Sequence, residues 1–531
     1  MNTKKTVLFC LLSLFGLLTL AQSISFSDVF KLEYRNAGYI QENDQIKGYY
    51  IFYQMDKVAK KTFAYRLQIL DEHMKEAVST IINRPKSYSL VEATFNGRAF
   101  LFLFFDQKKQ AFELATFDKQ GQELGVKQLE ARNPKDRALF WSTKYGPQVT
   151  QQGDEMGNPT IYPVGNHGFL RMFPMYTGAL KFGVTLEYYP NDLSESTFWS
   201  VKTPDKVYET KEILSVHGEY ATIFSSQYNT RDYSQSTGGI QVLDMRTGKK
   251  VLESNLIFEK KGIKPQFCEY LPESKEILIL GNYFDAKATN PTNLINGQGF
   301  CGLKLDLTGS VVQKNFMGWK ENASQFLDIN EKGKLKSGGS ISIHKIIQTS
   351  SGELFAIGEE YIQAKASSGG ASSGFGKIKG GALSSQASPE LGNMVIFKFA
   401  NDLTLEDVRM FEKQHSKVTM PIGFSLAPPG SIAILMKAFG LFDYAYTQQS
   451  KDKKQFFVSY FSSIKEKDKK KEPIFGVIVR DETGEFSTDQ IHLTTEASEM
   501  WVLPAKAGHV AICEYFQKDK RIDVRLEPIN Y

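Results

Sequence analysis

Residues 99–121 read AFLFLFFDQKKQAFELATFDKQG, and this stretch decides the fold. Ala99 to Phe105 is an apolar run of strand length without helical spacing, which is typical of a β-strand. A second apolar run, Ala115 to Phe117, leads into Asp118 and then Gly121. Because Asp tolerates the start of a tight reversal and Gly supplies the positive φ that the reversal needs, the pattern predicts a β-hairpin turn.

Segments of the same kind recur along the chain. Short apolar, β-branched or aromatic runs occur at Phe169 to Tyr176, Tyr220 to Phe224, Glu276 to Leu280, Glu353 to Ile357, Ser431 to Met436 and His509 to Cys513. Further strand-like runs end in acidic or glycine turns, whose acids are Asp71, Asp118, Asp192, Asp244, Asp306, Asp402 and Asp481. Their spacing leaves room for about four strands per unit, which is the content of a propeller blade.

These units predict an all-β protein, a β-propeller of seven or eight blades. Seven units fit before Gln490, and further strands between Met500 and Leu526 end the chain. We expect the final strands to complete a blade begun near the N-terminus, because closure removes the exposed edges of a sheet. The alternative is a pair of packed β-sandwich domains.

The repeated unit of strand, Gly, strand, Asp and turn Gly resembles the exported β-propellers of bacteria in a general way. It is seen in Glu276 to Leu280 with Gly302 to Gly309, and in Tyr220 to Phe224 with Gly239 to Gly248. The resemblance covers most of the mature chain. The Trp-Asp dipeptide and the Asp-box that mark particular propeller classes are missing, so it implies a fold and no catalytic residue.

The N-terminus has the three-part layout of a secretory signal peptide. Two lysines precede an apolar run at residues 6–20, and small residues follow near Ala21 and Ser23. We expect residues 1–21 to be a signal peptide, cleaved after Ala21 or Ser23, and the protein to be secreted or periplasmic. A retained membrane anchor is the less favoured alternative, because a span usually needs about 20 apolar residues.

The remaining chain, residues 24–531, is expected to form a single propeller-like β domain. A Gly/Ser/Ala/Lys-rich tract at residues 364–390 predicts a flexible insert between two strands. Lysine-rich stretches at residues 451–454 and 465–471 are interpreted as solvated hairpin ends, in preference to a site for an anionic polymer.

Composition narrows the range of partners. The formal net charge is only +5, and cleavage of the leader removes two lysines from it. This balance predicts no nucleic-acid partner, and no later apolar run has the length of a stable membrane span. Only Cys268, Cys301 and Cys513 remain in the mature chain, so at most one disulfide can form and the fold does not depend on disulfides.

The sequence contains no catalytic constellation. The seven histidines lack metal-ligand spacing, so no metal is predicted, and we expect them to be hydrogen-bonded or exposed at the start of strands. A Gly-x-Ser-x-Gly match at residues 370–374 lies in the low-complexity insert, where composition alone generates it. Phosphate and dinucleotide glycine motifs are missing, so no cofactor is predicted. The turn aspartates, one per unit, are interpreted as turn formers and not as calcium ligands.

Aromatic residues make up 13% of the chain. Core filling is the favoured interpretation, because aromatic side chains suit strands and pack between sheets. The functional alternative is a stacking platform at the mouth of a propeller channel, for which Trp141, Trp199 and Tyr444 are the candidate ligand-binding residues.

The sequence therefore favours a non-enzymatic binding or scaffold protein of the bacterial envelope or exterior, with an envelope glycan or another exported protein as its partner. The alternative is an extracellular hydrolase that acts on glycan or peptide with carboxylates contributed by different blades, since such a pair needs no local spacing. Two carboxylates within about 10 Å in a deep aromatic pocket would favour the hydrolase.

Overall fold

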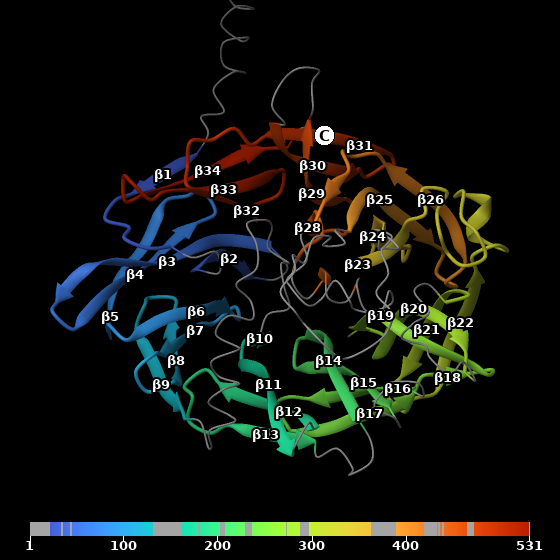
Figure 1. Ribbon diagram of the computed structural model, residues 1–531, viewed down its shortest axis with the longest axis horizontal. Coiled ribbons are helices and arrows are strands. Elements are labelled where there is room, and N and C mark those ends of the chain that lie inside the picture. The colour runs from blue at the N-terminus through green and yellow to red at the C-terminus, as the bar shows by residue number, and fades with distance from the viewer. Residues whose placement is uncertain are drawn as a thin grey trace, which may run out of the picture. The chain divides into compact units, whose positions relative to one another are not determined.

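The computed structural model describes residues 22–32, 36–42, 45–130, 161–178, 181–201, 208–228, 236–271, 273–286, 297–362, 389–418, 433, 436–437, 440–464 and 472–529. The expected signal peptide, the Gly-x-Ser-x-Gly match, most of the expected insert and the lysines at 465–471 lie outside these ranges. Nearly all described elements are strands, arranged in eight antiparallel sheets (Figure 1). The protein is thus an all-β β-propeller, and its eight blades agree with the prediction of seven or eight.

Two compact units make up the chain, namely Met1–Asn83 with Thr495–Asn530 (unit 1) and Arg84–Thr494 (unit 2). In unit 1, one sheet has the strands β2 (Ala37–Glu42), β3 (Gln45–Ala59), β4 (Thr62–Asp71) and β5 (Glu76–Pro85). The other sheet of unit 1 has the order β1 (Ser23–Phe26), β34 (Arg521–Pro528), β33 (His509–Phe516) and β32 (Glu499–Pro504).

Unit 2 contains the other six sheets, and their strands follow the order of the chain. The first sheet contains β6 (Tyr88–Phe95), β7 (Ala99–Asp106), β8 (Ala111–Asp118) and β9 (Glu123–Leu129). The second contains β10 (Ile161–Val164), β11 (Gly168–Gly178), β12 (Lys181–Pro190) and β13 (Thr197–Val201). The third contains β14 (Tyr208–His217), β15 (Tyr220–Tyr228), β16 (Ser236–Asp244) and β17 (Lys249–Asn255). The fourth is β18 (Ile257–Phe258), β19 (Lys261–Leu271), β20 (Glu276–Asp285), β21 (Gly299–Asp306) and β22 (Val311–Gly318), which the 3-10 helix η2 (Ala323–Gln325) follows. The fifth sheet contains β23 (Ser340–Gln348), β24 (Leu354–Ile362), β25 (Glu390–Phe399) and β26 (Leu405–Phe411), and β27 (Ser416–Lys417) pairs with β25. The sixth contains β28 (Tyr444–Gln449), β29 (Phe456–Ile464), β30 (Glu472–Arg480) and β31 (Phe486–His492).

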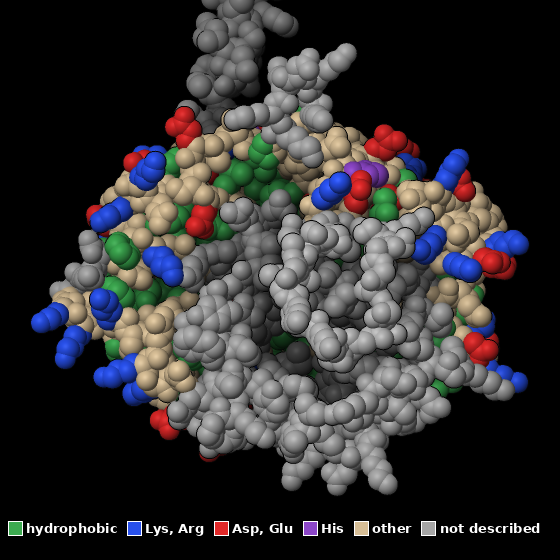
Figure 2. Space-filling model, in the orientation of Figure 1, with side chains coloured by type: hydrophobic (Ala, Val, Ile, Leu, Met, Phe, Trp, Pro, Cys, Tyr) green, Lys and Arg blue, Asp and Glu red, His purple; other side chains and the backbone are tan. Residues whose placement is uncertain are grey.

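Charges of both signs are mixed on the surface. On the face shown in Figure 2, Lys and Arg side chains are interspersed with Asp and Glu side chains over the described residues. This mixing agrees with the small net charge of the sequence, +5. No helix of the described residues is long and apolar enough to cross a membrane.

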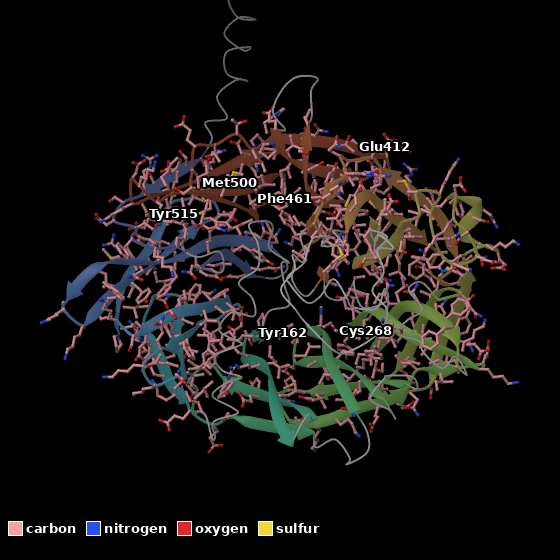
Figure 3. All side chains as sticks on the ribbon, in the orientation of Figure 1. Tyr162, Cys268, Glu412, Phe461, Met500 and Tyr515 are labelled. Carbon is pink, nitrogen blue, oxygen red and sulfur yellow. The ribbon has the colours of Figure 1, made fainter. Side chains whose placement is uncertain are left out.

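The sheet that contains β1 joins the two ends of the chain. β1 pairs with β34 in an antiparallel register from Ser23 opposite Arg525 to Phe26 opposite Ile522. This pairing confirms the expectation that the final strands complete a blade begun near the N-terminus. The core of unit 1 includes Phe26 and Tyr515. The Tyr515 hydroxyl, labelled in Figure 3, donates a hydrogen bond to the Phe30 carbonyl at 3.0 Å.

The seven predicted turn aspartates all lie at the hairpin between the last two strands in the main order of their sheets, as β21 and β22 illustrate. The Asp306 carboxylate accepts hydrogen bonds from the backbone N–H groups of Thr308 and Ser310 at 2.8 and 2.9 Å. Gly309 follows with a φ of 85°, the left-handed conformation that glycine adopts without strain. The hydrogen bonds, first from the Thr308 hydroxyl and then from backbone N–H groups, lower the pKa of Asp306. The turn-forming role of these aspartates is therefore confirmed.

The eighth sheet has no such aspartate, because it lacks the hairpin in which the aspartate would lie. Counted from β32, its last two strands are β34 and β1, which come from opposite ends of the chain and are not joined by a hairpin. Counting turn acids in the sequence therefore finds seven units, although the described residues form eight sheets.

Bulges recur in the first strands of several sheets of unit 2. The register shifts lie between Leu90 and Glu92, Ile213 and Ser215, Ile343 and Lys345, and Tyr444 and Tyr446. A bulge leaves one residue without a partner and redirects its side chain. In β23 the bulged residue is His344.

All three cysteines of the described residues are free and buried. Cys268 lies in β19 (Figure 3) and Cys301 in β21, and burial raises the pKa of the Cys301 thiol to about 12. A thiol that stays protonated is a poor nucleophile, so these cysteines serve as small core residues.

We predict that Phe26→Ala destabilises the protein by about 3–5 kcal/mol, because it removes a large side chain from the core beside β34. Phe30→Ala is the matched control, because the Phe30 side chain is 45% exposed whereas Phe26 is 6% exposed. Thermal unfolding followed by circular dichroism should show a lower melting temperature for Phe26→Ala only. Equal melting temperatures for the two variants would contradict the assignment of β1 to this sheet.

Candidate functional site

A cluster of ionisable side chains is buried between the sheet β23–β26 and the sheet β28–β31. It consists of His344, Glu359, Lys413 and Asp443 and is called the buried ion cluster below. His344 lies in β23, Glu359 in β24, Lys413 between β26 and β27, and Asp443 directly before β28. The side chains of Glu359 and Lys413 are 0% and 1% exposed.

Lys413 links the two carboxylates of the cluster. Its Nζ lies 3.1 Å from Glu359 Oε1 and 2.6 Å from Asp443 Oδ2. The Ser416 hydroxyl donates to the same Asp443 oxygen at 2.7 Å. The backbone N–H groups of Asp443 and Tyr444 donate to Glu359 at 3.3 and 3.0 Å. Charged and backbone donors thus bind Glu359 to the start of β28, which belongs to the neighbouring sheet.

His344 completes the cluster without a hydrogen bond from Nε2 to the carboxylate. Its Nε2 lies 3.6 Å from Glu359 Oε2, which is too long for a hydrogen bond, and its ring stacks on Tyr444 at 4.6 Å between centroids. Phe442 contacts the same ring edge-on. Burial lowers the pKa of His344 against the opposing effect of Glu359, so the ring is neutral at pH 7.

The two carboxyl groups are shifted in opposite directions. Burial alone would raise the pKa of Glu359, but the charge of Lys413 and the donated hydrogen bonds outweigh it and lower that pKa. Burial and the charge of Glu359 raise the pKa of Asp443 in spite of Lys413. Unequal carboxyls of this kind can serve as acid and base. Here both are enclosed, and the polar contacts hold two sheets together.

An open cleft lies at another edge of the same two sheets. It has a volume of about 270 Å³ and is called the charged cleft. Its charged lining residues are Glu353, Lys398, Glu406, Asp407, Arg409 and Arg480, and its aromatic lining residues are Phe355 and Phe486.

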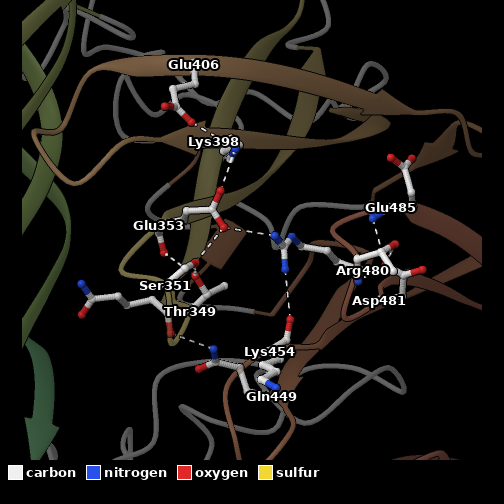
Figure 4. A network of polar contacts seen from close by, with 12 residues as sticks. Thr349, Ser351, Glu353, Lys398, Glu406, Gln449, Lys454, Arg480, Asp481 and Glu485 are labelled. Atoms are coloured by element: carbon white, nitrogen blue, oxygen red, sulfur yellow. Dashed lines mark hydrogen bonds and ion pairs between the residues drawn. The ribbon is translucent and has the colours of Figure 1, made fainter.

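Glu353 is the centre of a polar network in the charged cleft (Figure 4). Lys398 Nζ lies 2.7 Å from Glu353 Oε1 and 3.1 Å from Glu406 Oε2. Arg480 donates to Glu353 Oε2 at 3.1 Å and to the Lys454 carbonyl at 3.0 Å, and the Ser351 hydroxyl donates to Glu353 at 2.9 Å. These side chains are partly exposed, so the network is both preformed and open to solvent.

Guanidinium groups cover the aromatic rings of the cleft. The Arg480 guanidinium carbon lies 4.9 Å from the centre of the Phe355 ring, and that of Arg409 lies 4.9 Å from the centre of the Phe486 ring. The two rings also contact one another edge-on at 6.4 Å. Stacking of this kind restricts the guanidinium groups before any ligand arrives.

Contacts within the cleft favour the charged forms of Glu353 and Lys398. Burial would raise the pKa of Glu353, but the hydrogen bonds from Lys398 and Ser351 and the nearby positive charges lower it overall. The hydrogen bond to Glu353 is the largest of the effects that raise the pKa of Lys398. A carboxyl held ionised in this way is a hydrogen-bond acceptor and not a general acid.

The candidate ligand-binding residues of the sequence lie elsewhere. Trp141 is outside the described residues. The backbone of Trp199 in β13 pairs with Leu186, and the Trp199 side chain is not among the side chains that the structure describes. Tyr444 is 5% exposed, stacks on His344, and exchanges a hydrogen bond with the Thr447 hydroxyl. The structure thus places Tyr444 beside the buried ion cluster and leaves its role in ligand binding a prediction.

Sequence reasoning missed the buried ion cluster. His344 departs from the expectation for the histidines, because it is buried in the middle of β23 at a bulge. One signal was available, namely the consecutive acids Glu359 and Glu360 within an apolar strand. Buried acids of this kind require partners, although the sequence does not say which ones.

We predict that Lys413→Met lowers the free energy of unfolding by about 3–5 kcal/mol, because it leaves two buried carboxylates without their cation. Lys417→Met is the matched control on the same segment, where the side chain is exposed. Urea unfolding should leave this control close to wild type. A triple variant, Lys413→Met with Glu359→Gln and Asp443→Asn, should regain part of the loss, and a further loss would refute the electrostatic explanation.

We predict a pH dependence from Glu353, whose pKa is lowered from its ordinary value of 4.5 in the folded state. Such a group contributes stability above the pKa of the unfolded chain, and this contribution disappears as the pH falls through the folded pKa. Glu353→Gln should therefore be less stable than wild type at neutral pH, and the difference should shrink in acid. Urea unfolding between about pH 3 and pH 7 measures it, with the exposed Glu482→Gln as control. A constant difference across this range would disprove the assignment.

Comparisons with known proteins return distant β-propellers. The chain is similar to the WD40 domain of SCAP from fission yeast, with 9% identity and a TM-score of 0.36, over 96% of this chain and 99% of that one. It is also similar to prolyl oligopeptidase B from Galerina marginata, with 11% identity and a TM-score of 0.38, over 92% of this chain and 56% of that one. A post-proline cleaving enzyme from Rickettsia typhi has 10% identity and a TM-score of 0.36, over 92% and 58%.

The chain thus spans little more than half the length of these two peptidases, at 56% and 58%. Likenesses this distant say nothing about activity. No curated protein matches the sequence. The model of the family of unknown function DUF6770 matches residues 1–530, and the chain belongs to this family.

Proposed function

We propose that the protein is exported and acts as a non-enzymatic binding or scaffold protein of the bacterial envelope or exterior, with the charged cleft as its ligand site. The observation that carries the proposal is the state of Glu353 in an open cleft. Lys398 and Arg480 hold this carboxylate ionised at 2.7 and 3.1 Å. Fixed acceptors and donors beside aromatic rings suit recognition, because little ordering is lost when a ligand binds.

Export is supported by the sequence of the N-terminus. Lysines, a short apolar run and small residues near Ala21 follow one another as in a signal peptide. The processed chain should begin at Gln22 or Ile24. A location in the periplasm or outside the cell places an envelope glycan or another exported protein within reach of the cleft.

A hydrolase is the second candidate, and one observation favours it. Glu359 and Asp443 come from neighbouring sheets, contact the same lysine and have pKa values shifted in opposite directions. This is the kind of carboxylate pair that acid–base hydrolysis uses. Against it stands burial, because the side chains of Glu359 and Asp443 are 0% and 7% exposed. A substrate chain has no access to such atoms, and we therefore favour binding.

The proposal predicts binding without turnover. Processed protein, with its N-terminus checked by sequencing, is incubated with envelope glycans and peptides, and binding and product formation are measured in the same wells. Glu406→Gln in the cleft should weaken binding by about tenfold, as expected for one lost charge-assisted hydrogen bond. Asp443→Asn should leave binding unchanged if the variant folds, as circular dichroism can check. Product formation that Asp443→Asn abolishes would establish the hydrolase instead.

A further inference from the structure

The charges that line the charged cleft balance and are paired inside it. Lys398 contacts both Glu353 and Glu406, and Arg480 contacts Glu353. Arg409 Nε donates to Asp407 at 3.1 Å. Three cations therefore face three carboxylates. A charged ligand would have to displace one of these partners and leave a like charge beside it, which costs affinity. An uncharged ligand leaves every pair in place.

The outer atoms of these pairs offer donors and acceptors side by side. The side chains of Lys398 and Glu406 are 32% and 44% exposed, so both retain positions open to a ligand. A hydroxyl group donates one hydrogen bond and accepts two, and neighbouring hydroxyls on one molecule can therefore engage a cation and a carboxylate together. Because the network already fixes these side chains, binding orders few further rotamers.

Apolar surface accompanies the polar wall. Phe355, Phe486 and Ile396 also line the cleft, and Phe486 is partly exposed. Six of the eleven lining residues are charged, and Phe355 and Ile396 are only 1% and 2% exposed, so most of the cleft surface is polar. The volume of about 270 Å³ suits a short segment of a chain and not a large ligand.

We infer that the charged cleft binds a short segment of an uncharged, polyhydroxylated chain, that is, a neutral glycan. The inference rests on the proposed binding function and names its ligand class. Hydroxyl groups bridge Lys398 and Glu406, and Arg409, whose guanidinium group already covers Phe486, donates its outward N–H groups. A peptide or an anionic glycan is the competing ligand that the experiment below separates from it.

The test uses isothermal titration calorimetry on the processed chain with three probes: a set of neutral oligosaccharides, an oligosaccharide that carries uronic acids, and a short zwitterionic peptide. Each titration is run in about 0.05 M and about 0.5 M salt, since salt screens only interactions between charges. A neutral oligosaccharide should bind with a Kd that changes by less than about twofold between the two salt concentrations.

Two arginine variants locate the site. Arg409→Gln should weaken binding of the neutral oligosaccharide by about tenfold, because it removes guanidinium donors from the cleft. Arg246→Gln is the matched control, because Arg246 Nε also donates to a carboxylate, that of Glu219, at 3.1 Å, and the Arg246 side chain is exposed in the turn after β16. This control should bind as wild type does. Both substitutions are on the surface, and unchanged melting temperatures verify that the variants fold.

The outcomes separate the inference from the proposed function. Binding only of the acidic oligosaccharide or the peptide, weakened at high salt, would overturn the neutral-glycan inference and leave a binding protein. Failure of every neutral oligosaccharide to bind, or equal weakening by Arg409→Gln and Arg246→Gln, would overturn it as well. Turnover of any probe would overturn the proposed function itself.

Discussion

The antiparallel pairing of β1 with β34 is the constraint on which the rest of unit 1 depends. A sheet edge presents unpaired N–H and C=O groups, and β34 would present them if β1 were absent. Four residues from the N-terminal end, Ser23 to Phe26, satisfy this edge and bring Phe26 into the core. The first and last strands of the described chain thereby share one sheet, so the fold is complete only when both ends of the chain are in place.

Local patterns made most of the fold predictable, and non-local contacts made the site unpredictable. Asp306 and the other six turn aspartates could be predicted because an Asx turn depends on about five consecutive residues. The eighth sheet has no such signature, because no hairpin joins β34 to β1. His344, Glu359, Lys413 and Asp443 are spread over about a hundred residues, and a bulge that the sequence does not reveal turns His344 toward the others. The cleft residues likewise come from separate strands and meet only in the folded chain.

Burial separates the roles of the two polar sites. The buried ion cluster and the charged cleft use the same pair of sheets and the same chemistry, a cation between two carboxylates. In the cluster the charges are withdrawn from solvent, so their contacts serve specificity of packing. In the cleft the side chains are fixed but partly exposed, so the same contacts can be shared with a ligand. This contrast is the reason why we assign binding to the cleft and a structural role to the cluster.

Cysteine cross-linking tests the pairing of the chain ends most directly. Ser25 lies opposite Asp523, and Ser23 lies opposite Arg525. The pair Ser25→Cys with Asp523→Cys should form a disulfide on mild oxidation, because directly opposed Cβ atoms lie about 4.5–5.5 Å apart. The pair Ser25→Cys with Arg525→Cys, displaced by two residues, should not, and the natural cysteines are buried. Peptide mapping by mass spectrometry that finds the link only in the first pair would support the account, whereas no link in either pair, or equal linking in both, would contradict it.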